Sequence, residues 1–133
     1  MTGNGALETK TYTITRGDLI AYAEASGDHN PIHQDEEVAR SVGLPGVIAH
    51  GMYTMALAAR AVADWYPGAE LVSIGCKFTA PVVVPAEGGV EVEVAGEAKE
   101  PADGLTTIAL TVTSGGQKVL GMPKAVVRAP TDD

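Results

Sequence analysis

The chain has 133 residues, 45% of them hydrophobic and only 5% aromatic, so we expect one domain with an aliphatic core. A formal net charge of -8 supplies no basic stripe for nucleic acid and is typical of a soluble surface. No signal peptide is evident, the longest apolar-rich run (52–63) is too short to span a bilayer, and the single cysteine, Cys76, fits a reducing compartment. We therefore expect a cytoplasmic protein with neither nucleic acid nor membrane as a partner.

The first elements along the chain are a strand and a helix. Residues 1–9 show little periodicity and are expected to be flexible. Alternation over 10–15 predicts a short strand. Thr15 is the predicted N-cap of a helix over about 16–25, and Asp18 in its first turn suits the positive end of the helix dipole.

Two more helices are expected before the midpoint of the chain. A turn at 28–31 leads into a short surface helix over 34–42. The segment 50–64 is helical by propensity and apolar on nearly all sides, so we expect it to be buried. Its many alanines make it thin, which allows a sheet to approach it closely from more than one side.

The second half predicts an antiparallel sheet. Apolar and polar residues alternate over four segments, at about 72–79, 90–94, 107–113 and 117–128. Asp103-Gly104 and Ser114-Gly115-Gly116 are hairpin signals, and Pro123 suggests an edge position or a bulge in the last strand. The whole chain, 1–133, is interpreted as one α+β domain with a flexible end at 129–133, in which a sheet wraps around a helix.

The pair Asp28 and His33 is the first candidate for chemistry. Gly27 and Pro31 favour bends on either side of the acid, and such a bend can bring a carboxylate and an imidazole into one volume. An acid and a histidine held together can transfer protons at neutral pH. Because these residues are also ordinary turn formers, an Asx-type turn beside a solvated histidine stays open on spacing alone.

A metal site is a weaker interpretation of the same turn. Asp28, His29, His33 and Asp35 are close in sequence. No second cluster completes a ligand set, however, and alternate residues on a turn seldom converge on one point. We predict no metal.

The segment Ile48-Ala49-His50-Gly51-Met52 marks the expected start of the long helix. The N–H of Gly51 is among the first-turn donors without an intrahelical partner, and such a donor can bind a developing oxyanion. A tight packing position is an equally open interpretation of Gly51. His50 is interpreted as a residue that satisfies local hydrogen bonds.

Together these residues carry a resemblance. Tyr-Ala-x-x-Ser-Gly-Asp-x-Asn-Pro-Ile-His, from Tyr22 to His33, and the later Ala-His-Gly-Met resemble the signature of the MaoC-like (R)-specific enoyl hydratases and (3R)-hydroxyacyl-ACP dehydratases. The likeness extends from Tyr12 to Arg128 and is greatest to the catalytic B-type subunit of the mycobacterial dehydratases. It implies a hotdog fold, a dimer with an identical or related subunit, and a tunnel for an acyl chain on CoA or ACP.

The resemblance also implies roles. Asp28 and His33 would be the catalytic pair, the Gly51 N–H would hold the thioester carbonyl, and Asn30 would support the turn. Dehydration of a β-hydroxyacyl thioester needs one base and one acid and no cofactor; we assign His33 as base and Asp28 as acid or water-orienting group, although such a pair can titrate as a unit. Two rival functions stay open: a non-catalytic acyl-binding or scaffolding subunit, and a thioesterase on the same fold.

Two features depart from the family pattern. Many relatives carry a Gly-Asp before the first strand, which residues 1–9 do not supply convincingly. Some hydratases have a serine on the central helix, whereas Thr54 and Tyr53 bear the only hydroxyls of the segment 51–64. These differences bear on substrate preference.

Overall fold

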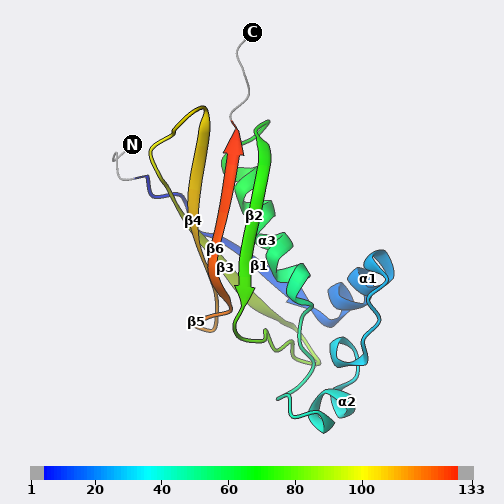
Figure 1. The fold of residues 1–133 in the computed structure, drawn as a ribbon. Coiled ribbons are helices and arrows are strands. Elements are labelled where there is room, and N and C mark those ends of the chain that lie inside the picture. Colours follow the sequence, from blue (N-terminus) through cyan, green and yellow to red (C-terminus); the bar gives the residue numbers. More distant parts are fainter. Residues whose placement is uncertain (1–4, 129–133) are drawn as a thin grey trace.

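The structure, a computed structural model, describes residues 5–128 and consists of one sheet with a long helix against it and a helical cluster at one end (Figure 1). In chain order the elements are β1 (Lys10–Thr15), α1 (Arg16–Ser26), the 3-10 helix η1 (Pro31–His33), α2 (Glu36–Ser41), α3 (Gly51–Trp65), β2 (Glu70–Phe78), β3 (Gly89–Ala98), β4 (Leu105–Ser114), β5 (Gln117–Lys118) and β6 (Leu120–Arg128). None of the described helices combines the length and apolar character that a membrane-spanning segment requires.

The sheet is antiparallel throughout the described residues, with the order β1-β3-β4-β6-β2 and β5 paired to β4. Both predicted hairpins are present. Asp103 and Gly104 adopt positive φ angles of 56° and 78° between β3 and β4, and Gly115 and Gly116 adopt 61° and 80° between β4 and β5. The predicted α+β class with an antiparallel sheet is therefore confirmed.

The core is aliphatic, as the composition predicts. Among the described residues, nineteen side chains form one buried cluster, of which nine are valines and four come from α3 (Leu57, Ala58, Ala61 and Val62). Ala58 and Ala61 are fully buried, so the thin side of α3 lies against the sheet. The expectation that this helix is buried on nearly all sides is wrong for the opposite side, where Met52, Arg60 and Asp64 are exposed.

The thinness of α3 has a measurable consequence for stability. Ala61→Leu inserts a larger side chain between helix and sheet and is expected to lower the free energy of unfolding by about 1–3 kcal/mol through overpacking. Ala63→Leu, at an exposed position of the same helix, is the matched control and should change it by less than about 0.5 kcal/mol. Denaturant unfolding of both variants measures the difference, and equal values for the two would contradict close packing at Ala61.

Part of the N-terminal segment pairs with the sheet, which its sequence does not predict. The N–H of Leu7 donates to the Gly96 carbonyl (2.9 Å), and the indole N–H of Trp65 donates to the carbonyl of Glu8 (2.7 Å). Residues 5–8 therefore lie along the sheet, a pairing that the sequence did not predict, because backbone pairing does not require the periodicity that we looked for; their flexibility stays a prediction. The expectations for 1–4 and 129–133 lie outside the described residues.

Helix α1 has well-defined ends, which matters for the turn that follows it. Thr15 and Asp18 form a capping box: the Thr15 hydroxyl accepts from the Asp18 N–H (3.2 Å), and the Asp18 carboxylate accepts from the Thr15 N–H (2.9 Å). At the other end Gly27 adopts φ 80°, and its N–H donates to the Ala23 carbonyl (2.9 Å). This left-handed glycine stops the helix one residue before Asp28.

The last predicted strand is divided. Val119 separates β5 from β6, and β6 lies between β4 and β2, so Pro123 does not lie on an edge strand. Pro123 and Met122 instead occupy a bulge: the β2–β6 register shifts there, and Met122 has a φ of 48°. Of the two alternatives for Pro123, the bulge is the correct one.

Candidate active site

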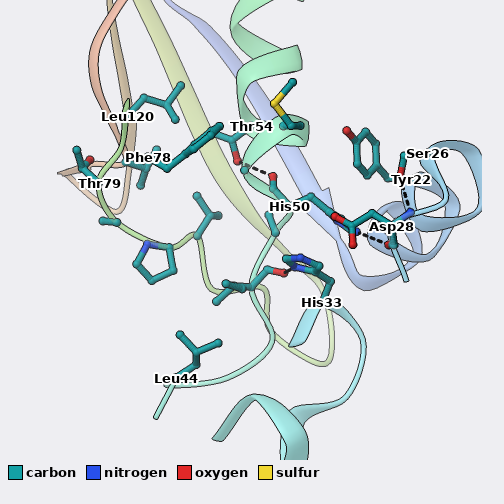
Figure 2. A pocket seen from close by; sticks show the side chains of 18 residues that line it. Tyr22, Ser26, Asp28, His33, Leu44, His50, Thr54, Phe78, Thr79 and Leu120 are labelled. Carbon is teal, nitrogen blue, oxygen red and sulfur yellow. Dashed lines mark hydrogen bonds between the residues drawn. The ribbon is translucent and has the colours of Figure 1, made fainter. Parts of the chain in front are cut away.

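A cavity of about 670 Å³ lies at the N-terminal end of α3, between the helical cluster and the ends of two strands (Figure 2). Tyr22, Ser26, Asp28 and His33 form its polar side, and Phe78, Thr79 and Leu120 lie across from them. The rest of the lining is Leu44, Ile48, Ala49, His50, Gly51, Met52, Thr54, Ala80, Pro81, Val82 and Val119. The volume is typical of a site for a small organic ligand, and most of its wall is apolar.

His33 is fixed at the end of the 3-10 helix with a defined tautomer. The Nδ1 atom of its ring lies 2.8 Å from the carbonyl oxygen of Ile48. Because a carbonyl oxygen only accepts, Nδ1 carries the hydrogen, and the neutral ring keeps its lone pair on Nε2. His33 is 7% exposed. It therefore offers a shielded base whose basic atom is free of this hydrogen bond.

Asp28 is held by its own turn and stays exposed. Its N–H donates to the Ser26 hydroxyl (3.1 Å), and its carboxylate accepts the N–H of Asn30 (3.3 Å). Asn30 in turn accepts the N–H of Ile32 (3.2 Å) and caps the 3-10 helix that ends at His33. Asn30 thus joins the turn of the acid to the turn of the base.

The folded chain brings Asp28, His33 and His50 together, with one potential donor atom from each within 4.8 Å of the others. The other two residues of the possible metal set lie apart from this group. His29 is exposed, and Asp35 accepts from the backbone of Glu37 and Val38 as the N-cap of α2. One nitrogen of each ring in the group is already hydrogen-bonded to a backbone carbonyl. The remaining donors could approach a cation, but the absence of a metal remains our prediction.

Gly51 is the first residue of α3 and lines the same cavity. Its N–H, like that of Met52, belongs to the first turn and has no intrahelical carbonyl to bind. A Cβ atom at Gly51 would lie 2.9 Å from two ring carbons of Phe78, closer than real Cβ contacts allow. The two interpretations of Gly51, an anion-binding donor and a tight packing position, are therefore compatible at one residue.

His50 is the residue whose place the sequence did not predict. It is 1% exposed, and its ring stacks on His33 with centroids 3.8 Å apart and an interplanar angle of 24°. Its Nε2 lies 3.1 Å from the backbone carbonyl of Asp28. Its position next to Gly51 in Ala-His-Gly-Met was the available signal, but sequence alone does not show that the ring turns toward the acid and the base.

The environment of His33 predicts a pH profile. The pKa of His33 lies below its ordinary value: burial and, to a smaller degree, the neighbouring His50 lower it, and together they outweigh the Ile48 carbonyl and the Asp28 charge, which raise it. A lowered pKa keeps the base neutral at pH 7. We expect the rate of any reaction in which His33 acts as the base to stay level down to pH about 6.5, the ordinary value for histidine, and to fall below that as His33 is protonated.

The same shift predicts how stability depends on pH. The folded state binds the proton less readily than the unfolded chain, so this contribution to stability is present above pH about 6.5 and is lost as pH falls through the lowered pKa of His33.

For the rate, a pH–rate profile with an acidic limb above pH 6.5 would contradict the lowered pKa of His33. Its control is the profile of the exposed-site variant His29→Gln, which should be the same as that of the parent.

The fold and the cavity define a class: an α+β domain that holds an acid, an imidazole and a helix N-terminus at one end of an apolar pocket. Residues 2–115 match the model of the MaoC like domain, and the chain belongs to that family. It is 34% identical over 128 residues to the 3-hydroxybutyryl-CoA dehydratase of Methylorubrum extorquens, covering 95% of this chain and 80% of that protein. It is 40% identical over 79 residues to 3-hydroxyacyl-thioester dehydratase X of Mycobacterium tuberculosis, covering 59% of this chain and 28% of that protein.

The solved structures agree with this assignment. A MaoC-like dehydratase matches with a TM-score of 0.90 and 35% identity, over 98% of this chain and 41% of that one. R-hydratase PhaJ1 of Pseudomonas aeruginosa matches with 0.83 and 30%, over 97% and 88%. These relatives confirm the expected hotdog fold and family. The chain spans 28% and 48% of the length of the first two curated relatives that it matches, so the activity of the whole protein is treated below as a proposal.

Proposed function

We propose that the protein catalyses the reversible dehydration of (3R)-hydroxyacyl thioesters to trans-2-enoyl thioesters in fatty-acyl metabolism. One observation carries the proposal: Asp28, His33 and the first residue of α3, Gly51, line one end of a single apolar cavity. The names of the relatives, a 3-hydroxybutyryl-CoA dehydratase and an R-hydratase among them, support the reaction class and its stereochemistry.

Gly51, His33 and Asp28 each have one role in the proposed dehydration. The Gly51 N–H donates to the thioester carbonyl oxygen and stabilises the charge that develops when the α-proton leaves. The free Nε2 of His33 takes that proton. The C–O bond at the β-carbon then breaks, and the departing hydroxyl leaves as water with a proton from Asp28 as the acid, or with the proton that His33 has taken while Asp28 orients the hydroxyl. Hydration is the same sequence reversed: the oxygen of water bonds to the β-carbon and a proton to the α-carbon, with no net oxidation or reduction, so no cofactor is required.

The cavity fits the apolar part of such a substrate. Leu44, Val82 and Leu120 line it beyond the polar end. A volume of about 670 Å³ accommodates a thioester and several methylene groups. Binding the acyl chain there would place the β-carbon beside Asp28 and His33.

We propose that a second hotdog subunit, identical or related, completes the protein. Strand β2 is an edge of the sheet within this chain and carries exposed Leu71, Val72 and Phe78. An apolar edge strand with unpaired backbone groups favours pairing with another chain. Structural neighbours include the ChsH1-ChsH2 complex and the HadBC complex of Mycobacterium tuberculosis, although their identities of 22% and 16% show the shared fold alone.

We also propose a cytoplasmic location. A single cysteine, Cys76, which is free, fits the reducing conditions of that compartment.

A turnover assay tests the proposal. The purified protein is incubated with crotonyl-CoA and with longer enoyl thioesters on CoA and on ACP, and the products are identified by mass spectrometry. We expect a mass gain of one water on the acyl group. Release of free thiol would indicate a thioesterase instead. A protein inert alone but active with a hotdog partner that lacks the Asp-x-Asn-Pro-x-His motif would be half of a heterodimer, and one that stays inert with such partners would favour a binding subunit.

A further inference from the structure

His50 is a buried histidine for which the proposed reaction has no step. Its side chain contacts both residues of the pair: Nε2 lies 3.1 Å from the backbone carbonyl oxygen of Asp28, and the ring stacks on His33 with centroids 3.8 Å apart. A carbonyl oxygen only accepts, so Nε2 is the protonated nitrogen of His50. The lone pair is then on Nδ1, which is buried and has no hydrogen-bond partner.

This arrangement of His50 does not favour the stability of the folded chain. A buried polar atom without a partner destabilises the folded state, because it has lost its hydrogen bonds to water. His50 is also the N-cap of α3, yet it makes no side-chain hydrogen bond to the helix. Asparagine, aspartate or serine at this position would cap the helix better. The residue is thus poorly suited to stabilising α3 and well placed to contact both members of the pair.

We propose that His50 is a positioning residue for this reaction, holding the Asp28 turn and the His33 ring in register with the Gly51 N–H. Because His50 immediately precedes Gly51, its hydrogen bond ties the acid to the start of α3. The stacking fixes the plane of the His33 ring, whose other tie is the bond to Ile48. The ring of Tyr22 also contacts that of His50, with centroids 4.7 Å apart. The inference rests on the proposed function and adds to it the residue that sets the geometry.

Two variants of similar chemistry separate positioning from stability. His50→Gln carries its amide N–H at the reach of Nε2, so it can keep the bond to the Asp28 carbonyl. His50→Asn is one methylene shorter and cannot reach that carbonyl, but it is the better helix N-cap. We expect the Asn variant to be at least as stable as the parent. Its kcat should fall by roughly 10²-fold with little change in KM, as a misplacement of about 1 Å can cause. The Gln variant should stay within about tenfold of the parent.

Controls make each outcome decisive. His29→Gln, at an exposed histidine next to Asp28, should keep the parental rate. The inference on His50 would be overturned by a parental kcat in the Asn variant, or by equal losses of kcat in the Asn and Gln variants. Activity of the parent protein would uphold the proposed function in either case. If the Asn variant does not fold, His50→Phe, which keeps a buried ring and lacks the donor, takes its place in the comparison.

A second readout is independent of turnover. Nitrogen NMR of the imidazole rings should show His50 with its hydrogen on Nε2 and His33 with its hydrogen on Nδ1. The opposite tautomer of His50 would remove the bond to Asp28 and overturn the inference, even if the parent proved inactive toward every thioester.

Discussion

The variants His33→Asn and Asp28→Asn are each expected to lower the rate of enoyl-thioester hydration by about 10²–10⁴-fold, which is the usual contribution of general acid–base catalysis. Both substitutions are chosen to preserve the local structure. The amide of an asparagine at residue 33 can still donate to the Ile48 carbonyl, as Nδ1 does at 2.8 Å, but it has no counterpart of Nε2. An asparagine at residue 28 can still accept the N–H of Asn30 but carries no charge.

The controls for these two variants concern folding and additivity. Asp35→Asn changes an acidic N-cap to an equally good one, so both the melting temperature and the rate should stay at the parental value. The double variant of Asp28 and His33 should be little slower than either single variant, because residues that act as a unit lose their effect together. Parental rates in either single variant would remove that residue from the catalytic pair.

The second large effect concerns Gly51. Gly51→Ala adds a Cβ beside the free N–H groups in the first turn of α3, where the thioester carbonyl is proposed to bind. We expect kcat to fall by about 10²–10³-fold, the loss seen when an oxyanion donor is removed. Gly75→Ala is the matched control, since a Cβ there meets nothing within 4 Å, and it should leave kcat unchanged.

A double variant distinguishes the two interpretations of Gly51. The new Cβ also lies 2.9 Å from the ring of Phe78, so part of any loss could come from displacement of that ring. Phe78→Ala removes the conflict. If the carbonyl of the substrate is what the Cβ obstructs, Gly51→Ala combined with Phe78→Ala should stay as slow as Gly51→Ala alone. Recovery to the rate of Phe78→Ala would show that the Cβ acts only through the Phe78 ring and does not obstruct the substrate carbonyl.

Local signals predicted the elements well because each depends on a few neighbouring residues. The cap at Thr15, the bend at Gly27 and both hairpins follow from side-chain hydrogen bonds or positive φ angles that the sequence specifies directly. Non-local features were missed for the same reason. The pairing of residues 5–8 with β3 uses backbone groups, which every sequence has.

The site was predicted in part. Asp28 and His33 are five residues apart, so a turn alone could bring them together. The contribution of His50 depends on how α3 docks against that turn, seventeen residues beyond His33. The contact between Gly51 and Phe78 likewise requires the pairing of β2 with β6 and the packing of α3 on the sheet. Spacing in the sequence carries no information about either.

The defined ends of α1 restrict how this protein can vary. Each residue of an α-helix turns the chain by about 100° and advances it by 1.5 Å. Because the capping box fixes where α1 begins and Gly27 fixes where it stops, a single insertion or deletion between them would swing the carboxylate of residue 28 away from its imidazole. Substitutions on the exposed side of α1 do not change the direction in which the chain leaves the helix. Descendants of this chain should therefore differ freely in the identity of those residues while keeping their number.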